Sequence, residues 1–324
     1  MSAQDDAQFQ TPNPGESKIQ NPKSKILCVG QIVADVVVRP VDALPAPGTL
    51  AMVEDLRLVP GGCACNTAAV LAKLGASVHI AGLVGDDAIG EAIIAQVVQY
   101  GVDVHFVRRS KDVPTSSVIV VVPSDGRQCF LYCVGGTEKF DASMVPTDHF
   151  DSFGYVHIGG AMKLANLNLA HVMRDAQAAG CVTSLDTDWD PSGRWMSIIE
   201  PALPHLDYLI TNDQEGQALT GLSDPAEIGR RLLFMGPGAV VVKLGENGSL
   251  LVDSDGVQRF PGVKVDVLDT TCAGDSFIAG LLFGLSSGRS LSDSMRLGNA
   301  AGALCTTQLS HFAIDSLESV EALL

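Results

Sequence analysis

Residues 66–85 read NTAAVLAKLGASVHIAGLVG, in which a run of small and apolar residues ends at Gly75 and a second apolar run follows directly. The first run predicts a buried helix with Gly75 as its C-cap, and SVHIAGLVG predicts a strand. Upstream, KILCVGQIVADVVV at residues 25–38 is typical of a strand that is buried on both faces of a sheet. Strand, helix and strand in this order predict a βαβ unit.

The same alternation recurs along the rest of the chain. The patterns predict helices in EAIIAQVVQYG and LAHVMRDAQAAG, and strands in FGYVHIGG, CVTSLDTD, DYLITN and AVVVKLG. Repeated units of this kind predict an α/β fold in which helices cover a mostly parallel sheet as a three-layer α/β/α core.

Two segments, at about residues 36–60 and 104–140, break the alternation. They contain β-rich stretches such as SSVIVVV and QCFLYCV, joined by the turn-forming PSDGR, with no helical pattern between them. We predict that they form a small antiparallel sheet that projects from the core as a lid. Exposed strand edges invite pairing, so we also expect a homodimer through this sheet.

The composition narrows the classes of partner. Lys and Arg total 21 against 37 Asp and Glu, a net charge of −16, and this excludes a general binder of phosphate backbones, so no nucleic-acid partner is expected. Residues 1–24 are polar and are predicted to form a disordered tail, whereas 25–324 form one globular domain. Apolar runs of about 18 residues and a signal-peptide pattern are both missing, so we expect a cytoplasmic protein with no membrane partner.

Residues 267–288, VLDTTCAGDSFIAGLLFGLSSG, carry the strongest chemical signal. Ala273 and Gly274 precede an apolar helical run, so backbone N–H groups converge at a helix N-terminus that favours a bound phosphate. Asp275 beside this cradle is placed to accept the proton of a hydroxyl that attacks phosphorus. Capping preferences alone favour a simpler role for Asp275 as a helix cap.

DTTCAGDSF in this segment resembles the C-terminal signature of the PfkB/ribokinase family of carbohydrate and nucleoside kinases, usually written DTxGAGD. Cys272 departs from the usual glycine or alanine and leaves the Ala-Gly-Asp core intact. PGGCACNTAAVLAKLG at residues 60–75 is similar to the N-terminal signature of the family, and AGLVGDDAIG at 81–90 is similar to the stretch that follows it. The resemblance runs from about residue 25 to about residue 307 with the motifs in family order, and it implies a ribokinase-like fold.

The resemblance implies that four residues bind the substrate that accepts the phosphoryl group. Asp35, at the end of the first strand, would accept hydrogen bonds from substrate hydroxyls. Gly61, Gly62 and Asn66 would approach the same substrate, since glycine lets the backbone come close. The other interpretation of Asp35 is a turn carboxylate after a strand.

ITNDQEG at residues 210–216 is similar to the N-x-x-E element of the family. The resemblance implies that Asn212 and Glu215 organise Mg²⁺ and phosphate, largely through water, as suits a hard cation that keeps its hydration. By itself the same stretch is read more simply as a helix cap followed by an acidic residue.

KLGENGSLL at residues 243–251 is similar to the K-x-G-x-x-G element that lies near the nucleotide in the family, although the letters also fit a hairpin turn. The residues assigned to ATP are Lys243, Gly245, Gly248, Thr270 and Asn299, together with Asn212.

Two further cation roles follow from the resemblance. Asp188, in the acidic stretch SLDTDWDPSGRW, would help to hold hydrated Mg²⁺, and a solvated acidic loop is an equal interpretation. Asp269 and Thr271 match positions whose backbone carbonyls bind a monovalent cation, which implies K⁺ as an activator. TTQLSHFAID at residues 306–315 departs from the Gly-Ala loop that often completes that site.

The resemblance therefore implies an ATP-dependent kinase that transfers a phosphoryl group to a hydroxyl of a sugar or related polyol, with Asp275 as general base. A nucleoside kinase of the same family and a non-catalytic sugar or nucleotide sensor remain alternatives. An oxidoreductase is disfavoured because G-x-G-x-x-G does not follow the first strand, and a P-loop kinase because Gly-Lys does not occur in the chain.

Overall fold

The computed structural model describes residues 24–124, 128–308 and 314–324. The predicted tail before residue 24, part of the PSDGR turn and part of the 306–315 stretch lie outside these ranges. Within them, every helix is too short or too polar to cross a membrane.

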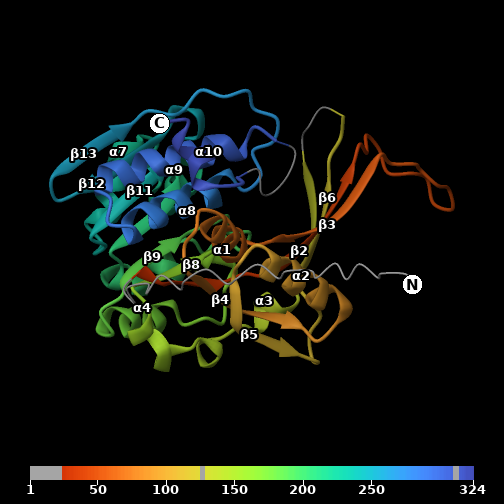
Figure 1. Ribbon diagram of the computed structural model, residues 1–324, viewed down its shortest axis with the longest axis horizontal. Helices are drawn as coiled ribbons and strands as arrows, with labels where there is room; N and C mark the ends of the chain where they lie inside the picture. Colours follow the sequence, from red (N-terminus) through yellow and green to blue (C-terminus); the bar gives the residue numbers. More distant parts are fainter. Residues whose placement is uncertain (1–23, 125–127, 309–313) are drawn as a thin grey trace, which may run out of the picture.

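A nine-stranded sheet forms the centre of the molecule (Figure 1). Its strands are β1 (Ile26–Gly30), β4 (Val78–Gly85), β5 (Asp103–Ser110), β8 (Tyr155–Gly159), β9 (Val182–Asp186), β10 (Tyr208–Asn212), β11 (Ala239–Lys243), β12 (Ser249–Asp253) and β13 (Gly256–Phe260). They lie in the order β13-β12-β11-β10-β9-β8-β1-β4-β5, with parallel pairing from β11 to β5 and antiparallel pairing at β12 and β13.

Helices cover both faces of this sheet, as the alternating pattern predicts. One face carries α1 (Cys63–Lys73), α2 (Ala88–Gln99), α8 (Ala273–Ser286), α9 (Leu291–Cys305) and α10 (Leu317–Glu321). The other carries α4 (Leu169–Ala178), α6 (Asp213–Thr220) and α7 (Pro225–Leu233), with the short α3 (Gly136–Lys139) and α5 (Met196–Ile199). Ile26 and Cys28 of β1 belong to the first core and Leu27 and Val29 to the second, so this strand is buried on both sides.

A separate four-stranded sheet projects from the core as the predicted lid (Figure 1). It contains β2 (Val33–Arg39), β3 (Asp55–Gly61), β6 (Ser117–Val121) and β7 (Cys129–Cys133) in the order β3-β2-β6-β7. The prediction of a purely antiparallel sheet is wrong, because β2 and β6 are parallel.

Two predicted boundaries are also wrong. The apolar run at residues 25–38 is two strands, since β1 ends at Gly30 in the core and β2 begins at Val33 in the lid, so that Asp35 lies within β2. Gly30 makes the break: its φ is 143°, and an added Cβ would lie 2.5 Å from the carbonyl oxygen of Gly159. Residues 103–110 pair with β4 as the edge strand β5 of the large sheet and are not part of the lid.

The register of the lid fixes which of its side chains share a face. Asp35 pairs with Val118 of β6, and Val118 pairs with Tyr132 of β7, so Asp35 and Tyr132 point to the same side. Ile119 and Leu131 pair one position along and point to the opposite side, where their side chains are 42% and 59% exposed. The lid therefore carries Asp35 and Tyr132 on one face and Ile119 and Leu131 on the other.

Candidate active site

Helix α8 begins where the sequence predicts a phosphate cradle. Cys272, immediately before it, has a left-handed backbone with φ of 61°, and its carbonyl accepts the Ser276 N–H at 2.9 Å. The Ala273 N–H, one of the predicted donors, already donates to the Thr270 carbonyl at 3.2 Å. The amides of Gly274 and Asp275 belong to the first turn, where N–H groups have no partner within the helix, so they are the donors best placed for an anion.

Asp275 is half-buried in this turn, and its Oδ2 accepts a hydrogen bond from Asn66 Nδ2 at 2.8 Å. Burial and the nearby Asp186 carboxylate raise the pKa of Asp275 to about 7, although Asn66 and Lys243 act in the opposite direction. A carboxylate with this pKa can hold a proton and release it near neutral pH, which is the property that a general base needs.

Lys243 brings a fixed positive charge to the cradle. Its Nζ lies 2.8 Å from Asp186 Oδ1, and a Cβ added to Gly274 would lie 3.2 Å from the same nitrogen. Burial would lower the pKa of Lys243, but the Asp186 and Glu215 carboxylates outweigh it and raise that pKa. Both members of the pair end parallel strands, β9 and β11, at the sheet edge where ligands of open α/β folds bind.

Asn212 and Glu215 form the helix cap that was the simpler interpretation of their motif. Asn212 Oδ1 accepts the Glu215 N–H at 2.8 Å, and Glu215 Oε2 accepts the Asn212 N–H at 3.3 Å, which completes a capping box at the start of α6. Thr187 Oγ1 donates to the same Glu215 oxygen at 2.6 Å. Glu215 is 7% exposed, and its role towards magnesium stays a prediction.

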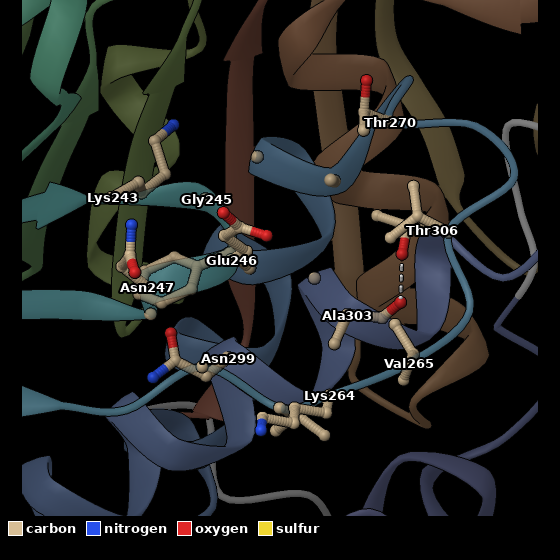
Figure 2. Close-up of a pocket in the computed structure, with 18 residues that line it drawn as sticks. Lys243, Gly245, Glu246, Asn247, Lys264, Val265, Thr270, Asn299, Ala303 and Thr306 are labelled. Carbon is tan, nitrogen blue, oxygen red and sulfur yellow. Dashed lines mark hydrogen bonds between the residues drawn. The ribbon is translucent and has the colours of Figure 1, made fainter.

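A cavity of about 890 Å³ opens beside the cradle (Figure 2). It lies between strand β11 with the loop that follows it, residues 262–267, and the helices α8 and α9. Val263, Val265 and Phe277 give it an apolar wall of the kind that suits a flat heterocyclic base. Five of the six residues that were assigned to ATP line it, namely Lys243, Gly245, Gly248, Thr270 and Asn299, whereas Asn212 does not.

Two of these lining residues have clear local roles. Gly248 has φ of 85°, and an added Cβ would lie 2.1 Å from the carbonyl oxygen of Phe260, so this position requires glycine. Asn299 Nδ2 donates to the carbonyls of Phe260 and Pro261 at 3.2 and 3.1 Å and thereby fixes the end of β13 against α9. Contact of Asn299 with adenine stays a prediction.

The predicted acceptor residues lie on the other side of Asp275. Asp35 packs against Gly61, since a Cβ added to Gly61 would lie 2.3 Å from Asp35 Oδ2. Gly62 has φ of 92° and precedes α1, the helix that carries Asn66. The pKa of Cys272 is raised by burial first, and then by the carboxylates of Asp275 and Asp35 among others. Both carboxylates therefore lie near Cys272.

Four side chains around Asp188 were missed by the sequence analysis. Lys163, in the 3₁₀ turn after β8, places Nζ 2.6 Å from Asp188 Oδ2 and 6.0 Å from the ring centre of Tyr132. Gln31 Nε2 donates to the same Asp188 oxygen at 3.4 Å and to the Gly160 carbonyl at 3.1 Å. Cys63 lies close enough for the Asp188 carboxylate to raise its pKa further than burial alone. We call Gln31, Cys63, Tyr132, Lys163 and Asp188 the acceptor-side cluster.

Cys63 connects this cluster to the reacting centre, because its Sγ and carboxylate oxygens of Asp186 and Asp275 all lie within 4.8 Å of one another. No local signal marks Gln31, Cys63 or Lys163 in the sequence, because they come from separate segments and meet only in the folded chain. Tyr132 is the exception, since strand alternation in QCFLYCV fixes which residues share its face. The magnesium role predicted for Asp188 stays untested.

The lid also contacts the segment before α8. Gln128 Nε2 donates to Asp269 Oδ1 at 3.2 Å and to Thr271 Oγ1 at 2.9 Å. Asp269 Oδ1 also accepts the Thr271 N–H at 2.8 Å, while the Thr271 carbonyl accepts from Cys305 Sγ at 3.3 Å. A potassium site at the Asp269 and Thr271 carbonyls stays a prediction.

Comparison with known proteins agrees with this geometry. The chain is 29% identical over 256 residues to the 2-dehydro-3-deoxygluconokinase of Bacillus subtilis, covering 75% of this chain and 79% of that protein. It is 28% identical over 261 residues to the aminoimidazole riboside kinase of Salmonella typhimurium, covering 76% and 82%. The structure of Arabidopsis thaliana ribokinase complexed with ribose and ATP superimposes with a TM-score of 0.80 and 25% identity, covering 92% of this chain and 97% of that one.

The ribokinase-like fold is thereby confirmed. The family model described as pfkB family carbohydrate kinase matches residues 23–314, which is most of the chain. Because the motif order, the fold and this match agree, the chain belongs to the pfkB family of carbohydrate kinases.

Proposed function

We propose that the protein is an ATP-dependent kinase that transfers the γ-phosphoryl group of ATP to a hydroxyl of a sugar or related polyol. The observation that carries this proposal is Asp275, with its pKa raised to about 7, at the same helix terminus as the first-turn amides of Gly274 and Asp275 and the Lys243 ammonium. A base, anion donors and a cation at one point are the parts that phosphoryl transfer requires.

In the proposed reaction Asp35, Asn66 and the Gly61-Gly62 backbone hold the acceptor. Asp275 accepts the hydroxyl proton as that oxygen bonds to the γ-phosphorus, and the bond from phosphorus to the bridging oxygen of ADP breaks. Lys243 and the amides of Gly274 and Asp275 stabilise the charge on the transferring group.

Buried carboxylates near the cradle fit a hydrated magnesium ion. Glu215 and Asp186 both raise the pKa of Lys243, so their carboxylates lie near the ammonium that we place beside the phosphates. We propose that Glu215 holds Mg²⁺ through water, where the ion supplies neutralisation of phosphate charge. Asp188 is already paired with Lys163, and we therefore place it on the acceptor side.

The first prediction concerns the acceptor. ADP release, measured with a panel of sugars and nucleosides, with and without K⁺, should identify at least one acceptor. Asp35→Ala should then raise the KM for that acceptor about tenfold or more, because a hydrogen bond to a charged group contributes about 1.5 to 3 kcal/mol.

The KM for ATP should change little in Asp35→Ala, and Asp42→Ala, which alters an exposed carboxylate of the same lid segment, should leave both KM values unchanged. A larger effect of Asp35→Ala on ATP than on the acceptor would contradict the assignment. Sugar and nucleoside kinases share the same base and cradle, so the panel separates these alternatives, and ATP consumption with any member rules out a mere sensor.

The pH dependence gives a second prediction. Asp275 must be deprotonated to accept a proton, and its pKa lies near 7, so kcat should fall about tenfold per pH unit below that value. Turnover at saturating substrates, measured from about pH 5.5 to about pH 9, checks this limb. A kcat that stays constant to the acid end of the range would exclude Asp275 as the base.

We also propose that two copies associate through the face of the lid that carries Leu56, Ile119 and Leu131. Leu56, Ile119 and Leu131 are 63%, 42% and 59% exposed there, a density of apolar side chains that favours burial against a second copy. A molar mass of one chain, measured by light scattering at working concentration, would contradict this.

A further inference from the structure

The acceptor side of the site is negatively charged. Asp35, Asp188 and Asp275 contribute carboxylates, whereas Lys163 is the cation of the acceptor-side cluster. Its ammonium already lies 2.6 Å from Asp188, with side chains that are only 28% and 18% exposed. The Lys163 charge is therefore neutralised within the protein before any substrate arrives.

Nearby groups keep Lys163 and Asp188 together. Gln31 is 3% exposed and donates to both Asp188 and the Gly160 carbonyl, so it holds the Asp188 carboxylate next to the turn after β8. A Cβ added to Gly160 would lie 2.1 Å from Gln31 Nε2, so a side chain at position 160 would displace this amide. Burial would lower the pKa of Lys163, but the Asp188 carboxylate outweighs it and raises that pKa.

We propose that the acceptor is an uncharged polyol and that the Lys163–Asp188 ion pair is the element that excludes acceptors bearing a carboxylate or phosphate. This inference rests on the proposed kinase function and narrows its substrate class. Paired in this way, Asp188 accepts hydrogen bonds from hydroxyls and Lys163 donates to them, which suits neighbouring hydroxyl groups. An anionic acceptor would have to face Asp35 and Asp275, and within the described part of the chain the cation of the acceptor-side cluster already has a carboxylate partner.

The first arm of the test compares neutral and anionic acceptors on the full-length protein. Ribose and fructose serve as neutral members, and 2-keto-3-deoxygluconate and fructose 6-phosphate as anionic ones. We expect kcat/KM for the better neutral member to exceed that of either anionic member by about tenfold or more, because like charges in contact are strongly unfavourable.

The second arm of the test removes the carboxylate partner of Lys163. Asp188→Asn removes the partner carboxylate and leaves the Lys163 ammonium free, so the ratio of anionic to neutral kcat/KM should rise about tenfold or more. Lys163→Met should move the ratio in the opposite direction. Damage to the fold alone would lower kcat/KM for both kinds of acceptor together and leave their ratio unchanged. Glu227→Gln, which breaks the exposed pair with Arg230 on α7, is the matched control and should not change the ratio.

Acceptor binding can be followed separately from turnover, because the chain has two tryptophans and both lie in the loop after β9. Trp189 adjoins Asp188, and its ring centre lies 5.0 Å from that of Trp195. Neutral acceptors should change this fluorescence at lower concentration than anionic ones, and Asp188→Asn should reduce the difference.

The outcomes are distinct. If an anionic acceptor is phosphorylated in preference to neutral ones, or if Asp188→Asn leaves the ratio unchanged, the inference is wrong and the kinase function stands. If no acceptor of either charge is bound or phosphorylated, both the proposed function and this inference are wrong.

Discussion

Asp275→Asn is expected to lower kcat about a hundred- to ten-thousandfold, the contribution of a positioned general base. ATP should bind as before, because the nucleotide cavity is lined by Ala273 and Gly274 but not by the Asp275 side chain. The amide has nearly the shape of the carboxylate and can still accept from Asn66, so the turn should keep its geometry. Steady-state turnover and calorimetric titration with ATP measure the two effects separately.

Asp293→Asn is the matched control, because Asp293 is an exposed carboxylate in the first turn of α9 and pairs with Arg296. It should leave kcat unchanged. Turnover near the wild-type level in purified Asp275→Asn protein would refute the base assignment.

The same substitution should stabilise the fold above neutral pH. The folded protein keeps a proton on Asp275 up to about pH 7, whereas the unfolded chain releases it near the ordinary value of 3.8. The folded state therefore binds more protons between these values, and the free energy of unfolding falls as the pH rises through this window. Asp275→Asn has no such loss, so its melting temperature at about pH 8 should exceed that of the wild type, as is common when a strained catalytic group is removed.

Lys243→Met is expected to have the second largest effect. It removes the cation beside Gly274, and loss of one such electrostatic contact typically lowers kcat about a hundred- to a thousandfold. It also leaves Asp186, which is 3% exposed, without its partner, a change that costs about 3 to 5 kcal/mol of stability for a buried pair. Turnover and chemical denaturation measure the two losses.

The double variant Lys243→Met/Asp186→Asn separates charge balance from catalysis. With the second charge also removed, the free energy of unfolding should largely recover, whereas kcat should stay low because the Lys243 ammonium no longer faces the phosphates. Recovery of turnover in the double variant would mean that Lys243 serves only to neutralise Asp186.

Most of the core could be predicted because the hydrophobic periodicity of the sequence coincides there with burial in the structure. The strands that end at Asp186, Asn212 and Lys243 are buried on both faces, and α6 and α7, which lie between the last two, have clear N-caps. The sheet to which each strand belongs could not be predicted, because alternation marks a strand and not its partner. The patterns therefore predict one strand at residues 25–38 and place residues 104–110 in the lid.

The candidate site shows the same division. Local motifs marked Asp275, Gly274 and Lys243, and the fold brings these three together. The ion pair of Lys163 with Asp188 left no trace in the sequence, since it depends on the left-handed backbone of Asp188, with φ of 63°, and on the turn after β8. Contacts between distant loops are set by tertiary packing and are invisible to periodicity.

The short connection between β1 and β2 has a consequence for how ATP is protected from hydrolysis. Only two residues separate a central core strand from the lid strand that bears Asp35, while Asp275 belongs to the core. The proposed acceptor residue thus lies on the lid and the proposed base on a helix of the core, and a connection of two residues joins the two sheets. An empty enzyme that leaves the lid and the core apart would present water with an incomplete apparatus, and such an arrangement guards the nucleotide against wasteful hydrolysis.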